Sequence, residues 1–355
     1  MSQNSVFNCL KFSSVVCFLL IFQLASGQSK KQPKEIGLDN FAELDGLVQR
    51  NEKTVGKNLV AMVWTDTVVY KREAGEMDMR TVVPLGAASQ WLTAALVMKF
   101  VEEGKISLDD KVVQYIPIYE TYAKSYITIG NCLNHFAGIA TDAKMFSKKK
   151  YESLEEVAEA LAKREIQTNP GTEFRYSSNG YHIVARILEI VGKKKFDMLM
   201  KQKVLNPLGM RKTTFSTLDG SAIDPFDGGQ GTAEDYMHFL KMLLNNGNYN
   251  GQQVLSQESI KELKKIQTRP EAIKYAPKQA EGLSYSTGSW VVEENAGGDG
   301  TALSSITGNG SWSMVDWCRG YAFLLLPKTS QGDQKREMYL EMKAAVDDRV
   351  KSKCK

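Results

Sequence analysis

The stretch LGAASQWLTAALVMKFVEEGKISLDD, residues 85–110, decides the fold of this chain. Its apolar residues recur at helical spacing from Ala87 to Val101, and Gly104 follows the last of them by a few positions. A periodic run of this length that ends at a glycine predicts one long helix over 87–103. Because the stripe consists of apolar side chains, we expect this helix to lie in the core of the protein.

Further elements are predicted on both sides of the long helix. Before it, residues 41–51 have helical periodicity, and residues 59–64 and 67–70 alternate around a turn at 65–66 like a β-hairpin. After it, helices are predicted at 155–164, 180–191, 196–204, 233–245 and 334–349, and strands at 288–293, 310–315 and 321–326. Strands near both ends of the chain, with helices between them, predict one sheet with a helical region packed beside it.

The N-terminus has the pattern of a signal peptide. Lys11 precedes an apolar run over 15–24, which passes into the small residues Ala25, Ser26 and Gly27. This run is about half as long as a membrane span requires. We therefore expect a signal peptide over 1–27, a linker over 28–40 and a single domain over 41–350. The mature protein is expected to be secreted and extracellular, without a membrane anchor.

Composition limits the classes of partner and cofactor. The 355 residues include 45 basic and 41 acidic side chains, so the net charge is only +4. The lysine clusters at 148–150 and 193–195 are short, as on solvated faces, and we expect no nucleic-acid partner. The three histidines lack the spacing of zinc ligands, so neither a metal nor a cofactor is expected. The pairing of Cys132, Cys318 and Cys354 stays open.

Several segments in order resemble one family, the serine β-lactamase-like superfamily, which includes class C β-lactamases, D-Ala-D-Ala peptidases and related esterases. The resemblance covers roughly residues 41–326 and rests on the segments 85–110, 127–139, 170–181, 207–210 and 231–244. It implies an α+β fold in which an antiparallel sheet, built from both ends of the chain, is flanked by helices and accompanied by a helical subdomain.

The first motif of the family is Ser-x-x-Lys at the start of a helix. That spacing puts a hydroxyl and an amine on one helix face, so the amine can take the hydroxyl proton during attack on a carbonyl. By the resemblance, the serine position is Ala87 and the lysine position is Gln90, which provide a methyl group and a neutral amide. Ser89 lies two residues beyond Ala87, about 200° around the helix, and is expected to point away from the cleft.

The other two motifs are also altered. The family's Tyr-x-Asn corresponds to Tyr176 and Ser178, with Asn179 next to it but out of phase. The third motif, a cation or hydroxyl two residues before a glycine, has two candidate positions, 306–308 and 302–304, neither of which begins with Lys, His or Ser. Asn309 begins an N-glycosylation sequon, Asn-Gly-Ser, near the expected rim of the cleft.

A family scaffold with an altered nucleophile, base and third motif predicts a pseudoenzyme. We therefore expect no catalytic residues, with Ala87, Gln90, Tyr176 and Ser178 as vestigial positions. Secreted animal members of the superfamily occur outside cells, and some belong to calcified shell matrices, so the resemblance implies a binding or structural role in extracellular matrix with protein or polysaccharide partners. The alternatives are an active esterase or peptidase that uses Ser89 or a water at Tyr176, and ligand capture in the old cleft without turnover.

Overall fold

The fold is taken from a computed structural model, which describes residues 34–35, 41–66, 68–141, 150–306, 310–329 and 336–354. The predicted signal peptide lies outside these residues. The predicted linker is described only at Lys34–Glu35, a two-residue strand that pairs with the main sheet. Cleavage near residue 27 and the domain limits at 41 and 350 therefore stay predictions.

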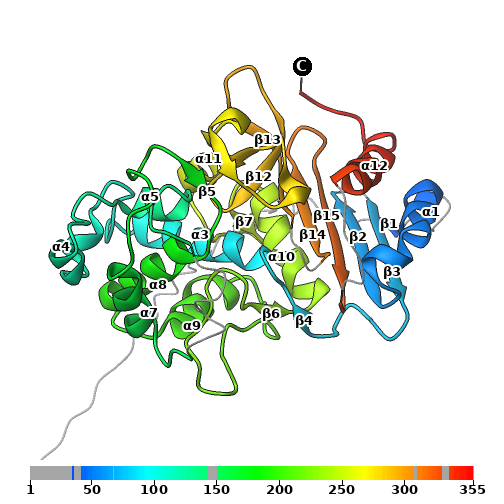
Figure 1. The fold of residues 1–355 in the computed structure, drawn as a ribbon. Coiled ribbons are helices and arrows are strands. Elements are labelled where there is room, and N and C mark those ends of the chain that lie inside the picture. The colour runs from blue at the N-terminus through cyan, green and yellow to red at the C-terminus, as the bar shows by residue number, and fades with distance from the viewer. Residues whose placement is uncertain are drawn as a thin grey trace, which may run out of the picture. The chain divides into compact units, whose positions relative to one another are not determined.

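The main feature is a nine-stranded sheet with the order β1-β3-β2-β15-β14-β13-β12-β11-β9 (Figure 1). Every neighbouring pair is antiparallel except β1 with β3. The pairing of β15 with β2 joins the two ends of the chain, as the prediction of one sheet built from both ends requires. The strands are β1 Lys34–Glu35, β2 Leu59–Thr65, β3 Val68–Ala74, β9 Ile266–Thr268, β11 Ser284–Ser286, β12 Ser289–Glu294, β13 Gly300–Ile306, β14 Trp312–Asp316 and β15 Tyr321–Pro327.

Both faces of the sheet centre are buried. Alternate residues of β2 belong to two different hydrophobic clusters: Val60 and Met62 to one, Ala61 and Val63 to the other. Because successive side chains of a strand point to opposite faces, the two clusters mark the two faces. The whole of β2 is consequently buried, although its sequence was interpreted as a simple alternation of apolar and polar residues.

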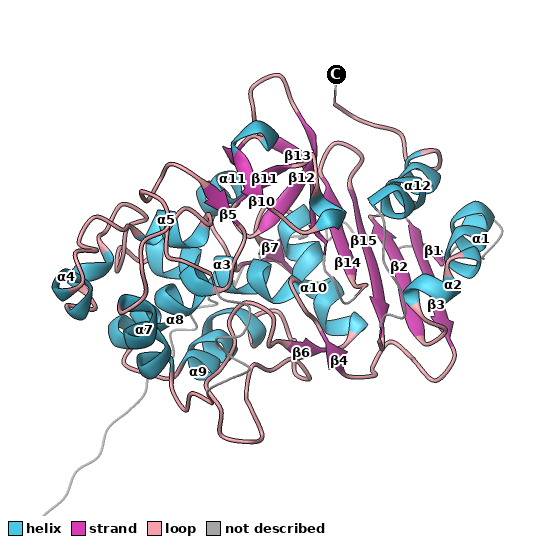
Figure 2. Ribbon diagram, in the orientation of Figure 1, coloured by secondary structure: helices cyan, strands magenta, loops and turns pink. Residues whose placement is uncertain are grey.

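Helices cover each face (Figure 2). On one side, the buried residues of α1 (Ala42–Arg50) and α12 (Arg336–Asp347) join the cluster of Ala61 and Val63. On the other side lie α3 (Ala88–Glu102), α10 (Ala233–Leu244) and α11 (Gln257–Lys264). Helix α3 is the predicted long helix, and it is buried on nearly every side, as expected for a central core helix.

The remaining helices form the helical region beside the sheet, as expected. They are α4 Ile118–Thr121, α5 Ile129–Leu133, α7 Leu154–Ala162, α8 Asn179–Gly192 and α9 Phe196–Met200, which continues as a π-helical turn over Lys201–Leu205. Helix α2 is Glu52–Val55, and small two-stranded sheets pair β4 Val83–Pro84 with β6 Gln230–Gly231, β5 Phe174–Arg175 with β10 Ile273–Tyr275, and β7 Asn248–Tyr249 with β8 Gln252–Gln253. Within the described residues, no helix has the length and hydrophobicity that crossing a bilayer requires.

Among the elements that the sequence analysis did not predict are α11 and β13. Strand β13 consists largely of small and polar residues, which have a weak strand signal by themselves. Its serines are nevertheless buried because they find partners on β14: the Trp312 indole donates to Ser304, and the Ser305 and Ser313 hydroxyls are 2.6 Å apart. Tertiary hydrogen bonding therefore stabilises this strand.

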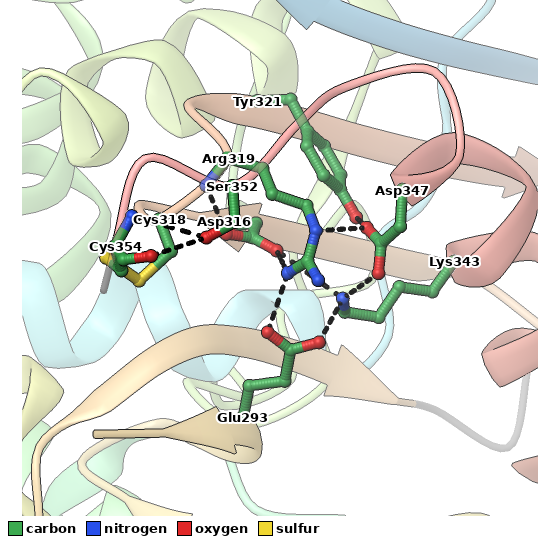
Figure 3. A network of polar contacts seen from close by, with 9 residues as sticks. All are labelled: Glu293, Asp316, Cys318, Arg319, Tyr321, Lys343, Asp347, Ser352 and Cys354. Carbon is green, nitrogen blue, oxygen red and sulfur yellow. Dashed lines mark hydrogen bonds and ion pairs between the residues drawn. A yellow bond between two sulfur atoms is a disulfide. The ribbon is translucent and has the colours of Figure 1, made fainter. Parts of the chain in front are cut away.

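The C-terminal segment is attached to the sheet by a disulfide and by a charged network (Figure 3). Cys318 is bonded to Cys354, which settles the pairing that the sequence left open, while Cys132 is free and buried. Lys343 of α12 contacts Asp347 at 2.5 Å and Glu293 of β12 at 2.6 Å. The contact with Glu293 ties α12 to β12 of the main sheet.

Candidate functional site

The turn before α3 is fixed from two sides. The backbone N–H of Leu85 donates to the carbonyl of Gly229 at 2.8 Å, and the Ser311 hydroxyl donates to the carbonyl of Leu85 at 3.1 Å. Gly86 then adopts a left-handed φ of 58°, which favours glycine, and Ala87 is the N-cap of α3. The backbone turn at the start of α3 is therefore held in a defined position. The side chain of Ala87, at the start of the helix, is only a methyl group.

Gln90 lies one turn into α3 and contacts Tyr176, which follows β5. The Gln90 side-chain N–H donates to the Tyr176 hydroxyl oxygen across 2.6 Å, although 86 residues separate them in sequence. Gln90 is only 2% exposed and Tyr176 is half-buried. The structure thus brings together two of the four predicted vestigial positions, and a backbone bond from the Gln90 N–H to the Ala87 carbonyl puts a third in the same turn.

The hydrogen bond between Gln90 and Tyr176 joins two uncharged side chains. Burial, and then the charge of Asp227, raises the pKa of Tyr176 well above its ordinary value. An amide such as Gln90 has no proton-accepting nitrogen, and its carbonyl oxygen is a very weak base. The pair therefore consists of two neutral groups, and neither is a nucleophile prepared for acyl transfer.

Ser89 is fully buried and has a structural role. Its hydroxyl oxygen accepts a hydrogen bond from the backbone N–H of Gly229 at 3.0 Å, and a Cβ built on Gly229 would come within 2.7 Å of that oxygen. The loop backbone packs directly on the Ser89 hydroxyl, which leaves no room for a carbonyl substrate. This matches the expectation that Ser89 points away from the cleft.

Ser178 and Asn179 are consecutive in sequence, but they make different contacts. Ser178 is the N-cap of α8, and its carbonyl accepts from the His182 ring. The Asn179 amide is buried and donates to the carbonyls of Ile139 and Ala140, each at 3.3 Å. Asn179 therefore holds a neighbouring loop and does not replace the family's asparagine, in agreement with its predicted phase.

A buried histidine, which the sequence analysis did not single out as a site residue, lies behind Tyr176. The His135 ring is 4.7 Å from the Tyr176 ring, centroid to centroid, and its Nε2 is 3.0 Å from the Tyr285 hydroxyl. The Tyr285 hydroxyl is in turn 3.3 Å from that of Tyr181. Burial lowers the pKa of His135 to about 3, so the imidazole is neutral at physiological pH. Aromatic packing thus supports the cleft wall from behind.

The loop after residue 223 contributes two carboxylates near Tyr176. Phe226 packs on Tyr176, with ring centroids 5.2 Å apart, and this contact positions the adjacent Asp227. Asp227 is exposed at the surface, and crowding of its carboxylate by the surrounding protein, followed by repulsion from Asp224, raises its pKa above the ordinary value. Among the described residues no cation pairs with Asp227. Sequence reasoning missed this residue because nothing in its local pattern links it to Gln90 or Tyr176.

The third motif can be placed only in part. Residues 302–304 lie inside β13, paired with strands on both sides, so this candidate is part of the sheet interior. Ile306, the first residue of the other candidate, is buried, and Ser311 beyond it contacts the turn before α3. Residues 307–309 lie outside the described residues, and so does the sequon asparagine Asn309.

One group of carboxylates has the spacing of a metal site, although the sequence predicted none. Oxygens of Glu293, Asp316 and Asp347 lie within 4.8 Å of one another. Arg319 contacts them at 2.7, 2.9 and 3.3 Å, and Lys343 contacts all three as well (Figure 3). These two cations pair with all three carboxylates and offset two of the three negative charges, so the group is a structural ion-pair network that does not fit a divalent cation.

Comparisons with known proteins match the chain to one family and to penicillin-binding and carboxypeptidase-like relatives. A sequence profile of the family described as "Beta-lactamase" matches residues 47–346, which is most of the chain. Among curated relatives, penicillin-binding protein 4 of Amycolatopsis lactamdurans is 27% identical over 149 residues, covering 41% of this chain and 39% of its own. A "Putative D-alanyl-D-alanine carboxypeptidase" of Salmonella typhimurium is 25% identical over 249 residues, covering 59% and 57%. The chain thus spans less than two thirds of the length of these relatives.

A solved structure extends the likeness to nearly the whole fold. The "putative beta-lactamase" from Bacteroides dorei superposes with a TM-score of 0.76 at 23% identity, covering 87% of this chain and 98% of its own. At this identity the likeness concerns the fold alone. It matches the α+β architecture, with a large antiparallel sheet and flanking helices, that the sequence predicted.

Proposed function

Because the chain belongs to the beta-lactamase family, we propose that it is a secreted, catalytically inactive member that acts through binding or as a structural part of an extracellular matrix. The observation that carries the inactivity is the contact between Gln90 and Tyr176. A neutral amide fills the place of the base, and its hydrogen bond to the phenol occupies the cleft beside Ala87. A serine hydrolase needs an activated hydroxyl at this point.

Two features support the extracellular location. Residues 1–27 have the pattern of a signal peptide, and Cys318 is joined to Cys354. Disulfides persist in oxidising compartments and are rare in the cytosol. The specific case we favour is the matrix of a calcified shell, as the family resemblance implies. Since the chain contains no acidic run to bind mineral calcium, its role there would depend on protein or polysaccharide contacts.

The direct test of inactivity is covalent labelling of the mature natural protein. It is incubated with a fluorophosphonate, which reacts with activated serines, and its intact mass is measured beside an active serine hydrolase. We expect an unchanged mass for this protein and a complete shift for the control. An adduct on any serine, Ser89 above all, would overturn the proposal.

One observation favours a second candidate, a hydrolase with an altered constellation. Asp227 has a pKa near 7 and lies close enough to Tyr176 to perturb its ionisation, so it could serve as a general base for a water at the phenol. In that case an activated aryl ester would be hydrolysed with a rate that rises through pH 7, and Asp227→Asn would abolish the hydrolysis. If neither the natural protein nor the Asp227→Asn variant hydrolyses the ester, the second candidate is rejected and the proposal of an inactive family member is kept.

A further inference from the structure

Six lysines gather where the ends of three helical segments meet. We call this surface the lysine ridge; it consists of Lys105 after α3, Lys193, Lys194 and Lys195 between α8 and α9, and Lys201 and Lys203 in the π-helical turn. Figure 1 shows α9 following directly on α8 in the helical region. In the sequence only 193–195 stand out as a cluster, and the fold brings the other three lysines to it.

Side-chain contacts connect parts of the ridge. The Lys194 ammonium donates to the Gln202 side-chain oxygen at 2.8 Å, which brings the 193–195 cluster to the π-helical turn. From there Lys203 reaches Glu103 at 2.5 Å, and Lys105 reaches the same carboxylate at 2.8 Å. Both ammonium groups also lie over the Phe100 ring, at 5.2 and 5.5 Å from its centroid.

The ridge carries an excess of positive charge. Glu103 is shared by two lysines, and although burial by itself would raise its pKa, hydrogen bonds from Lys105 and Lys203 lower it. The other four lysines, 193, 194, 195 and 201, are exposed and have no acidic partner within the described residues. These four side chains therefore add uncompensated positive charge to this surface, which attracts anions.

Helix dipoles explain only part of this arrangement. A cation near a helix C-terminus is favourable by about 0.3–1 kcal/mol, which accounts for Lys193 at the end of α8 and for a lysine after α3. It does not account for three consecutive lysines without an acid, or for Lys201 beside them.

We propose that the lysine ridge binds a sulfated polysaccharide, whose closely spaced sulfate groups match a row of ammonium groups. This inference rests on the proposed extracellular location, where such polymers occur. A nucleic acid is disfavoured because the ridge offers lysines only, without the arginines or exposed aromatic rings that stack on bases. An anionic membrane is disfavoured because the only large apolar side chain exposed on α9 is Met198.

The test uses the mature protein, immobilised heparin as the sulfated probe, and hyaluronan, which carries carboxylates but no sulfates. The ridge variant combines K193Q, K194Q, K195Q and K201Q. The control variant combines K53Q, K57Q, K274Q and K278Q, which remove the same charge from exposed lysines elsewhere. Thermal unfolding of all three proteins checks that each is folded, as expected for exposed substitutions.

We expect the natural protein and the control variant to bind heparin in a salt-dependent way and hyaluronan weakly. The ridge variant should bind heparin at least tenfold more weakly, since each lysine near an anionic surface contributes roughly 1 kcal/mol. Equal losses in both variants would overturn the proposal, as would tighter binding to a single-stranded oligonucleotide or to phosphatidylserine vesicles than to heparin. If the protein is labelled by the fluorophosphonate but still binds heparin through the ridge, the proposal of catalytic inactivity is rejected. The proposal of a polysaccharide site at the ridge is then unaffected.

Discussion

The network beneath α12 and the cleft at the start of α3 are both polar and largely buried, but they differ in how charge is arranged. In the network, Arg319 and Lys343 both pair with each of three carboxylates. In the cleft, the central contact joins a neutral amide to a neutral phenol, and the nearby Asp227 has no cationic partner among the described residues. The first region has what a buried ion cluster needs for stability. The second lacks the cation–nucleophile pair that acyl transfer needs, and the proposed inactivity rests on this difference.

The largest effect should come from breaking the network. Lys343→Met removes a cation that is only 4% exposed and leaves three carboxylates with Arg319 as their one remaining cation in the network. Unpairing a buried charge costs about 3–5 kcal/mol, so the free energy of unfolding should fall by that amount in a urea titration. A change of less than ~1 kcal/mol would contradict the role we assign to the network.

Acid should destabilise the protein through the histidine behind the cleft. His135 has a pKa of about 3 when folded and an ordinary value of 6.5, so the unfolded state binds more protons between these pH values. Stability from this group is therefore complete above pH 6.5 and is lost as the pH falls, by about 3 kcal/mol at pH 4.

The matched variant is His135→Asn, because asparagine tolerates the left-handed φ of 62° at this position. Its unfolding free energy should depend less on pH between 4 and 6.5. Asp227 acts in the opposite direction, since its raised pKa makes the folded state hold a proton more tightly and lose stability as the pH rises from about 4 to 7. Identical pH profiles for the natural protein and His135→Asn would rule out this assignment.

Removing the disulfide should have an effect of similar or smaller size. Cys318 and Cys354 are 36 residues apart, and opening a loop of that length costs roughly 2–4 kcal/mol. Cys354→Ser should lower the melting temperature, and a reductant should lower that of the natural protein by the same amount without affecting the variant. A reductant effect on the variant would point to a different source of redox sensitivity.

The smallest effect should come from the cleft itself. Gln90→Leu and Tyr176→Phe each remove one partner of the 2.6 Å contact, and a double-mutant cycle should give a coupling of about 0.5–1.5 kcal/mol. Unfolding in urea measures all four proteins of the cycle. Zero coupling would mean that the two side chains do not form a hydrogen bond in solution.

Sequence reasoning succeeded where the evidence is a local pattern of residues or a motif of the family. The long helix α3 has a periodic pattern and a terminal glycine, and the segments that resemble the family follow one another in order along the chain, so the fold could be predicted. Strand β13 was missed because its buried serines depend on partners across the sheet. His135 and Asp227 come to Tyr176 only through tertiary packing, over separations that no spacing rule encodes.

The central claim is that two substitutions, at Ala87 and Gln90, keep the cleft from acylation. The most direct measurement compares the intact masses of the natural protein and of a variant carrying Ala87→Ser and Gln90→Lys after exposure to the same fluorophosphonate. The account predicts no adduct on the natural protein and one adduct, on the introduced serine, in the variant. An adduct on the natural protein would contradict the account.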